Sequence, residues 1–438
     1  MEINVEVVSK EIIKPSSPTS SHLRTYHLSF LDQISSHVYN PFVLFYQNHK
    51  NLNNHNLLHL YSTNIKKSLS NLLSRYHLFA GRLKQTTVDC NDEGIPYFEA
   101  KINCKLSDFL QNPDPQQLHK FIPFELNGLG LDLLLGLQFN LFNCGGIAIG
   151  ICISHKVADA ISCLLFIKNL AATTRGCTDD DDDQNKIVWP KFESAKLFPP
   201  KEASALGRPG GVVIPTLKIV TRRFVFGSDK IESLRAKYQE EDGATRRPSR
   251  VETLSAFITS RFMAALKVGF GDDKRRLVIG HAFNLRKRVD PPLEENSFGN
   301  IARPFVKVLS SNNMSDVMSQ MRELIVSGDD KEHAKSLQKE GIDPTLNFFE
   351  QHADELMKGE LVCICFTSIC RFPLYVDFGW GKPSWVATNP FPYKNFVVLA
   401  DSRLGGIEAY IDMEEEDMVK FQNDQELLSF VSDPYITI

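Results

Sequence analysis

His155 and Asp159 are the residues of this chain whose types and spacing most directly suggest chemistry. They lie in the segment GICISHKVADAISC, where an apolar run stops at the histidine and an aspartate follows four residues later. A neutral imidazole can remove a proton from an attacking alcohol, and a nearby carboxylate could orient the ring. The two side chains could also bind a metal ion from adjacent helical turns, but no convincing third ligand stands nearby. By itself the spacing is short, and a lone histidine at a strand end is more often a satisfied structural residue than a catalyst.

Hydrophobic periodicity predicts the elements that position this pair. Residues 147–153 indicate a buried strand, and from 160 to 172 the apolar spacing becomes helical, so His155 lies where a strand gives way to a helix. Such a junction often presents a side chain to a cleft. Amphipathic helices are also predicted at 57–73 and 249–266, and strands and helices alternate in both halves of the chain. This alternation is typical of the α/β class.

The length of 438 residues favours two domains rather than one. Between 176 and 215 the composition changes, because five consecutive aspartates at 179–183 precede a stretch rich in proline and glycine. Such a charge run is typical of a solvated loop, and it lacks the alternating spacing of a calcium-binding loop. We therefore expect an N-terminal domain over 1–175, a crossover loop over 176–215 and a C-terminal domain over 216–438.

Composition and charge limit the possible partners and surroundings. A formal net charge of −4 gives no reason to expect nucleic acid, and no apolar run approaches the ~18 residues of a membrane span. The N-terminus has no signal-peptide core, and the C-terminus carries no retention, peroxisomal or prenylation signal. The nine cysteines form no C-x-x-C pair, which favours reduced, buried thiols over disulfides or a zinc site. These features predict a soluble, monomeric protein of the cytosol.

Several separated segments together resemble one known family. They are IKPSSPT at 13–19, LSFLDQ at 28–33, FAGRL at 79–83, SHKVADA at 154–160, FNLRKR at 283–288, DFGWGKP at 377–383 and GGIEAY at 405–410. Over essentially its whole length the chain resembles the plant BAHD acyltransferases, which move acyl groups from coenzyme A thioesters to alcohols or amines. Within that family it looks most like the group of vinorine synthase and deacetylvindoline acetyltransferase.

The resemblance implies a fold and a set of substrates. The expected fold is α/β, with two similar chloramphenicol-acetyltransferase-like domains, each a mixed β-sheet flanked by helices. A channel at their interface would carry His155 at its centre, with acyl-CoA entering from one side and the acceptor from the other. Acyl-CoA would be a co-substrate, and neither a metal ion nor a permanently bound cofactor is implied.

The resemblance also implies roles for single residues. His155 would be the general base, and Thr367, the first residue of the segment Thr-Ser-Ile at 367–369, would face the oxyanion. Asp159 would turn away from the channel and pair with Arg286, linking the two halves of the chain. An orienting role for Asp159 toward the imidazole remains the alternative.

Two further segments receive less direct roles. In DFGWG, Asp377, Gly379 and Gly381 would form a tight architectural turn far from the histidine, because glycines flanking an aromatic residue permit such a turn. A phosphate-binding loop is the rival interpretation, but the spacing matches no nucleotide motif. Ser249 and Arg250 would contact CoA, although a plain helix N-cap explains Ser249 equally well.

The chain departs from the family at Ile369, where relatives usually have tryptophan, and the segment leading to DFGWG is one residue shorter than usual. Losing the indole ring removes a donor and should widen the acceptor pocket, which favours a bulky partner. The sequence therefore predicts an O-acyltransferase that moves an acetyl group from acetyl-CoA to a polycyclic alkaloid or terpenoid alcohol. Malonyl, tigloyl and aromatic donors, N-acylation of an amine, and a catalytically weak relative that only binds a small molecule remain open.

Overall fold

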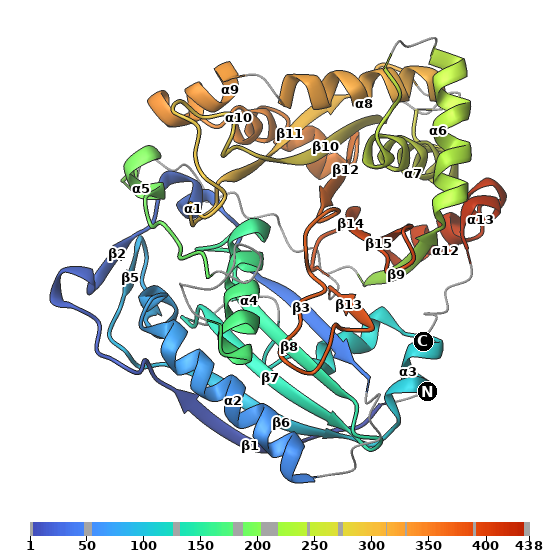
Figure 1. Cartoon of the computed structure of the whole chain (residues 1–438). Coiled ribbons are helices and arrows are strands. Elements are labelled where there is room, and N and C mark those ends of the chain that lie inside the picture. The colour runs from blue at the N-terminus through green and yellow to red at the C-terminus, as the bar shows by residue number, and fades with distance from the viewer. Residues whose placement is uncertain are drawn as a thin grey trace.

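The computed structural model describes most of the chain as strands and helices arranged in two halves (Figure 1). The described residues are 3–47, 55–125, 132–177, 187–202, 218–242, 246–269, 275–311, 313–328, 331–388 and 391–432. The aspartate run at 179–183 lies outside them. Among the described residues, no helix is both long and apolar enough to cross a membrane.

The strands, in chain order, are β1 Val5–Ile13, β2 Thr25–His27, β3 Tyr39–Tyr46, β4 Arg82–Leu83, β5 Thr87–Asp89, β6 Ile95–Ile102, β7 Leu135–Phe142, β8 Ile147–Ser154, β9 Ile219–Phe226, β10 Arg276–Asn284, β11 Ala302–Val308, β12 Leu361–Ser368, β13 Trp385–Ala387, β14 Phe396–Asp401 and β15 Ile407–Glu414.

The α-helices are α1 Phe30–Ile34, α2 His55–Leu73, α3 Leu106–Gln111, α4 Ala160–Arg175, α5 Ser194–Leu197, α6 Ser228–Asp242, α7 Arg250–Leu266, α8 Met314–Gly328, α9 Lys331–Lys335, α10 Pro344–Gln351, α11 Ala353–Lys358, α12 Glu415–Gln422 and α13 Gln425–Phe430. The short 3-10 helices are η1 Ser21–Leu23, η2 His77–Ala80 and η3 Pro115–Phe121.

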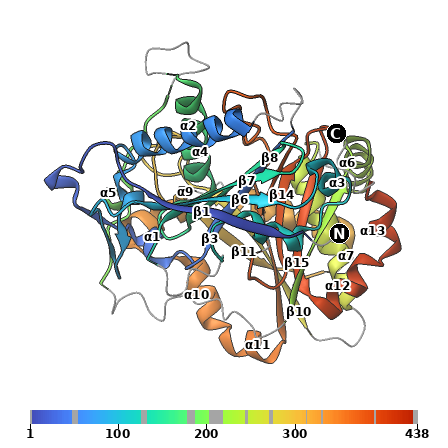
Figure 2. The ribbon, with the colours of Figure 1, turned by 90° about the horizontal axis from the view of Figure 1, so that it is seen from below.

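Each half is built on one six-stranded mixed sheet. The strand order is β1-β6-β7-β8-β3-β13 in the first sheet and β11-β10-β12-β14-β15-β9 in the second, and a three-stranded sheet of β2, β5 and β4 lies apart. Helices α2 and α4 lie side by side on the first sheet, whereas α6, α7 and α8 pack together beside the second (Figures 1 and 2). The helices bury the apolar rows of each sheet, which is the packing expected of alternating strands and helices.

The two sheets share the same four-strand core. In the first, β6 runs parallel to β7, and β7, β8 and β3 then pair antiparallel. In the second, β12 runs parallel to β14, and β14, β15 and β9 pair antiparallel in the same order. The hairpin β7–β8 leads into α4, and the hairpin β14–β15 leads into α12. The two halves are therefore similar α/β domains, although their sequences show no repeat.

The two domains exchange segments across their boundary. Strand β13, from the C-terminal part of the chain, pairs antiparallel with β3 at the edge of the first sheet. Phe30 and Leu31 of α1 are buried in the core of the second domain, whereas Phe378 and Trp385 are buried in the core of the first. The domain boundaries at 1–175 and 216–438 remain a prediction for the main part of each domain. Periodicity identifies an apolar segment but not the core that it joins.

Candidate active site

Strand β8 and the turn after it place His155 at the junction of the two domains. Every residue of β8 is buried, and the strand ends at Ser154. The backbone N–H of His155 then donates to the carbonyl of Val38, 2.8 Å away, and the N–H of Val157 closes a turn on Ser154. His155 as a whole residue is partly buried, so it keeps some exposed surface at this strand-to-helix junction.

The ring of His155 contacts Asn300, from the loop that precedes β11 in the second domain. Nδ1 of His155 lies 2.9 Å from Oδ1 of Asn300, and Nδ2 of Asn300 donates to the backbone carbonyl of His155 at 2.7 Å. Asn300 in turn donates from Nδ2 and from its backbone N–H to Oδ1 of Asp32, at 2.9 and 3.0 Å. The three residues therefore form one hydrogen-bonded chain across the domain boundary.

Sequence reasoning missed Asp32 and Asn300. Asp32 lies in LSFLDQ, one of the segments that carry the family resemblance, but nothing in that segment indicates a contact to His155. Asn300 is one polar residue in the loop between β10 and β11, 145 positions from the histidine. A contact over that separation depends on how the domains pack, which no local pattern reports.

The surroundings of His155 lower the pKa of its imidazole below its usual value. Burial is the largest cause, because it penalises the charged ring, and Arg303 acts in the same direction. The hydrogen bonds of the ring to the backbone of His155 and to Asn300, and the charge of Asp159, oppose this effect without overcoming it. His155 is therefore neutral at neutral pH, and a neutral imidazole is the form that can accept a proton.

Lys156, the next residue, is a third buried group that sequence reasoning missed. Its Nζ donates to the carbonyls of Gln33 and Ser35 at 2.8 and 3.0 Å. Burial lowers the pKa of this amine to about 8, and the charge of Asp32 opposes the shift. The lysine fastens the turn after β8 to the end of α1.

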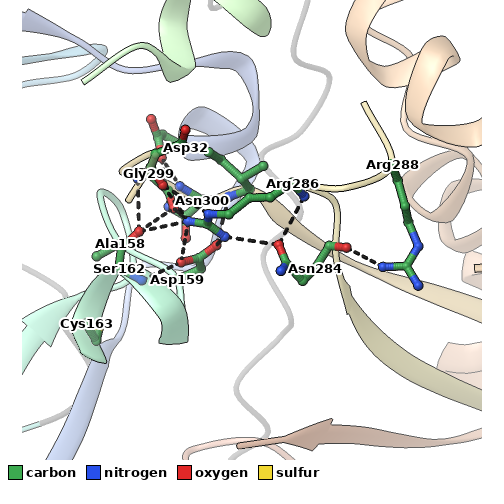
Figure 3. A network of polar contacts seen from close by, with 12 residues as sticks. Asp32, Ala158, Asp159, Ser162, Cys163, Asn284, Arg286, Arg288, Gly299 and Asn300 are labelled. Atoms are coloured by element: carbon green, nitrogen blue, oxygen red, sulfur yellow. Dashed lines mark hydrogen bonds and ion pairs between the residues drawn. The ribbon is translucent and has the colours of Figure 1, made fainter. Parts of the chain in front are cut away.

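Asp159 and Arg286 form a bidentate ion pair between the two domains (Figure 3). Nη1 of Arg286 donates to Oδ2 of Asp159 at 2.7 Å, and Nη2 donates to Oδ1 at 3.1 Å. The side chain of Arg286 is 0% exposed and that of Asp159 is 4% exposed, so the pair is almost fully dehydrated. Arg286 also donates to the carbonyl of Ser297 and to the hydroxyl of Ser162, so the guanidinium is hydrogen-bonded beyond the ion pair.

Asp159 also begins helix α4. Its Oδ1 accepts the backbone N–H of Ser162 at 2.9 Å, an N-cap contact, and its Oδ2 accepts the N–H of Ile301 at 3.0 Å. Burial opposes ionisation of this carboxyl, but Arg286 and the N–H donors outweigh it, so the pKa of Asp159 lies below its usual value. Within the described residues Asp159 makes no hydrogen bond to the ring of His155. This favours the structural role over the orienting role.

Thr367 lies on the side of the second sheet that faces the first domain. In β12 it pairs with Val398 of β14, and paired positions in neighbouring strands point to the same face. Val398 is buried in the core of the first domain, whereas Val397 and Leu399 are buried in that of the second. Thr367 makes no hydrogen bond to His155 in the described part of the chain. Its role toward an oxyanion remains a prediction.

Ile369 is buried in the core of the first domain, with 7% of its surface exposed. Its backbone N–H donates to the carbonyl of Leu399 at 2.9 Å. So small an exposed fraction leaves little surface for contact with an acceptor. The predicted place of Ile369 in the acceptor pocket stays a prediction.

The DFGWG segment forms a tight turn against the first domain. Oδ1 of Asp377 accepts the N–H groups of Gly379 and Gly381, at 2.7 and 2.9 Å. Both glycines have φ of 109°, a conformation that side chains with a Cβ rarely adopt. Trp380 between them stacks on Tyr61 of α2, with ring centroids 4.4 Å apart. These contacts fit the architectural role, since none of them involves His155.

Ser249 and Arg250 both have structural partners at the start of α7. Ser249 caps the helix by accepting the N–H of Glu252 at 3.1 Å, and Glu252 returns a contact to the N–H of Ser249, which completes a capping box. Arg250 donates to Asp401 and to the carbonyl of Gly405 at 2.8 and 2.9 Å. Their contact with CoA remains a prediction.

The described residues contain no group of histidine, cysteine and acidic side chains that could hold a metal ion. None of the nine cysteines forms a disulfide. A groove between β1, β6, β7 and η3, lined in part by Lys10, Phe98, Lys120 and Gln138, contains none of the residues of the His155 network.

The chain is similar to known proteins over nearly its whole length. The model of the Transferase family matches residues 3–428. Stemmadenine O-acetyltransferase of Catharanthus roseus is 37% identical, and the match covers 97% of each chain. Limonoid 1-O-acetyltransferase of Citrus sinensis is 35% identical over 99% of each chain.

A solved structure shows the same architecture. The crystal structure of vinorine synthase superposes with a TM-score of 0.81 at 33% sequence identity, over 99% of this chain and 100% of that one. This confirms the expected fold, in which two similar α/β domains each carry a mixed sheet flanked by helices.

Proposed function

Because this chain belongs to the BAHD family of CoA-dependent acyltransferases, we propose that it acetylates a hydroxyl group of a bulky alkaloid or terpenoid, with His155 as the general base. The observation that best supports this role is the environment of His155. His155 is only partly buried at the junction of two domains, and the pKa of its imidazole is lowered. Its Nδ1 faces Asn300, and among the described residues its Nε2 has no hydrogen-bond partner, so Nε2 can accept a proton.

The proposed reaction begins with proton removal from the acceptor. An alcohol is a poor nucleophile at neutral pH until a base takes its proton during attack. Nε2 of His155 accepts the hydroxyl proton as the oxygen forms a bond to the thioester carbonyl carbon. The carbonyl oxygen becomes an oxyanion, and the hydroxyl of Thr367 donates a hydrogen bond to it.

Collapse of the tetrahedral intermediate completes the transfer. The carbon–sulfur bond breaks, the electron pair leaves with the CoA sulfur, and the imidazolium of His155 returns its proton to that thiolate. The products are the ester and free CoA, and the histidine is again neutral. No covalent acyl-enzyme forms, because both substrates meet at one histidine.

The choice of acetyl donor and polycyclic acceptor rests on the relatives. Stemmadenine O-acetyltransferase and limonoid 1-O-acetyltransferase both carry O-acetylation in their names, and they match this chain over nearly its whole length. For the contacts with CoA we keep Ser249 and Arg250 as candidates. We also propose a monomer acting in the cytosol, which light scattering and a fluorescent fusion would test.

The decisive experiment is an acyl-transfer assay with the purified chain. Acetyl-CoA is supplied with a panel of polycyclic alcohols, release of free CoA is followed with a thiol reagent, and the ester is identified by mass spectrometry. Equimolar competition with malonyl-, tigloyl- and aromatic CoA identifies the donor, and an amine panel tests N-acylation. Tight binding of acyl-CoA without any turnover would favour a binding protein instead.

His155→Ala should reduce turnover by about 10²- to 10⁴-fold, the usual contribution of a general base. Binding of CoA and the melting temperature should change little. In the wild type, kcat should stay constant at neutral and higher pH and fall in acid, with a midpoint below the usual histidine value of about 6.5, because the pKa of His155 is lowered.

His27→Ala is the matched control, since His27 is exposed on β2 in the same domain and should leave turnover unchanged. Equal acyl transfer by His155→Ala and the wild type would refute the mechanism.

A further inference from the structure

We propose that Asn300 and Asp32 are positioning residues that hold His155 in the one neutral tautomer that can act as a base. The inference rests on the proposed function, because only a base needs a free ring nitrogen. A neutral imidazole carries its proton on Nδ1 or on Nε2, and the hydrogen bond made by one nitrogen decides the state of the other. A free histidine side chain in water favours the proton on Nε2, which is the wrong tautomer for this task.

The geometry around Asn300 fixes the proton on Nδ1. The atom that faces Nδ1 of His155 at 2.9 Å is Oδ1 of Asn300, which can only accept, so Nδ1 must donate. Both hydrogens of Nδ2 are already engaged, one with the carbonyl of His155 at 2.7 Å and one with Oδ1 of Asp32 at 2.9 Å. Turning the amide over would bring its oxygen against these two acceptors and lose both hydrogen bonds.

Asp32 is what makes this amide orientation unique. It is buried, with none of its surface exposed, and its Oδ2 accepts the N–H and the hydroxyl of Ser29 at 3.0 and 2.7 Å. The contact with the N–H of Ser29 is one half of the capping box of α1, whose other half is the N–H of Asp32 on the Ser29 hydroxyl, so rotation of the carboxyl group would break the start of the helix. The start of α1 thereby orients Asn300, and Asn300 orients the imidazole.

A neutral amide in this place has a different consequence from a carboxylate. A carboxylate beside Nδ1 would raise the pKa of the imidazole, because an opposite charge favours the protonated ring. Asn300 supplies the same accepting oxygen without the charge, so the ring remains a neutral base. The other charged groups that affect the ring are Asp159, which raises its pKa, and Arg303, which lowers it.

The first test reads the tautomer directly and needs no substrate. Uniform 15N-histidine labelling should show His155 at pH 8 with a protonated Nδ1 and an unprotonated Nε2, the signals being assigned by their loss in His155→Ala. Asn300→Ala and Asp32→Asn should each convert a measurable fraction to the Nε2-protonated form. A wild-type His155 already protonated on Nε2 would overturn the proposal, whether or not the variants fold.

The second test measures turnover. In serine proteases the wrong histidine tautomer costs about 10⁴-fold in kcat, and a partial conversion here should cost at least about tenfold. In Asn300→Ala the loss should lie in kcat, with KM changed less than about twofold. In the double variant Asp32→Asn/Asn300→Asp the carboxylate faces the ring, so part of the lost kcat should return. The midpoint of the fall of kcat in acid, called here the acid limb, should move upward by about 1–3 pH units.

Asn296→Ala is the matched control, because Asn296 lies in the same loop and donates to the carbonyl of Trp189 rather than to the His155 network. This variant should leave the tautomer of His155, the value of kcat and the fall of kcat in acid unchanged. Loss of kcat in Asn300→Ala with an unaltered tautomer would show that Asn300 acts in some other way. Absence of any turnover in the wild type, with the expected tautomer present, would instead refute the proposed function alone.

Discussion

At the scale of single residues, the junction between the domains brings together a candidate base and a candidate oxyanion donor from opposite sides. His155 comes from the end of β8, and Thr367 comes from the face of β12 that is turned toward the first domain. The histidine is recognisable from its motif. The donor is recognisable only by resemblance, because a threonine near the end of a strand has no distinctive spacing.

Thr367→Val should lower kcat more than it raises KM, because a hydroxyl aimed at the oxyanion acts mainly in the transition state. Loss of one such donor is worth about 3 kcal/mol, or roughly a hundredfold in kcat. Steady-state kinetics with the preferred acceptor measure the split, and Thr367→Ser, which keeps the hydroxyl, is the control. A raised KM at constant kcat would make Thr367 an ordinary pocket residue.

At the scale of elements, one ion pair connects the start of α4 to the end of β10. Asp159 caps α4 and binds Arg286, which follows β10, and Ile301 before β11 donates to the same carboxylate (Figure 3). The turn that carries His155 is therefore fixed from both domains. The sequence pattern alone left the partner of Asp159 open, because an aspartate four residues after a histidine fits either role.

Asp159→Ala should destabilise the protein by about 3–5 kcal/mol, because it leaves Arg286 charged and buried without its partner. Asp159→Asn keeps the hydrogen bond that caps α4 at Ser162 and should lose less stability. Thermal unfolding of the two variants therefore separates the contribution of the cap from that of the charge. Activity should fall together with stability. A fall in activity at unchanged melting temperature would return Asp159 to an orienting role.

The same pair should contribute to acid unfolding. Since the folded pKa of Asp159 is lowered, its contribution to stability is complete above the usual aspartate pKa of about 3.9 and is lost as the pH falls toward the lower folded value. The difference in melting temperature between the wild type and Asp159→Asn should therefore narrow only in strong acid.

At the scale of the whole molecule, buried contacts from exchanged segments hold the domains together. Nε1 of Trp385, in β13, donates to Glu408 of β15 at 3.1 Å, and Glu408 is paired with Arg223 of β9 at 2.7 Å. The first sheet is thus tied to the second through its own edge strand. The DFGWG turn adds a second attachment, through Trp380 on Tyr61.

Trp380→Ala should lower stability and leave chemistry intact. Fully buried tryptophans cost about 3–5 kcal/mol on truncation to alanine, and the partly buried Trp380 should cost about 2–4 kcal/mol. Measured well below the melting temperature, kcat and the pKa of the acid limb should equal those of the wild type. Trp380→Phe, which keeps a ring against Tyr61, should recover most of the stability. A selective loss of kcat would give DFGWG a part in catalysis.

The sequence by itself determined the class of the fold, the strand and helix on either side of His155, and the family. Period-two and helical spacing depend on near neighbours in the chain, so residues 147–153 and 160–172 were predicted within one to three residues of β8 and α4. The resemblance added the pairing of Asp159 with Arg286.

Only the tertiary structure decided which groups surround His155. Asp32 and Asn300 are 268 residues apart, and Lys156 meets carbonyls more than 120 positions away. The sequence pattern also did not predict that β13 and α1 each pack in the other domain. Contacts of this kind arise from how two preformed sheets pack, and their free energy depends on shape and desolvation at the interface. Local spacing in the chain does not encode these quantities.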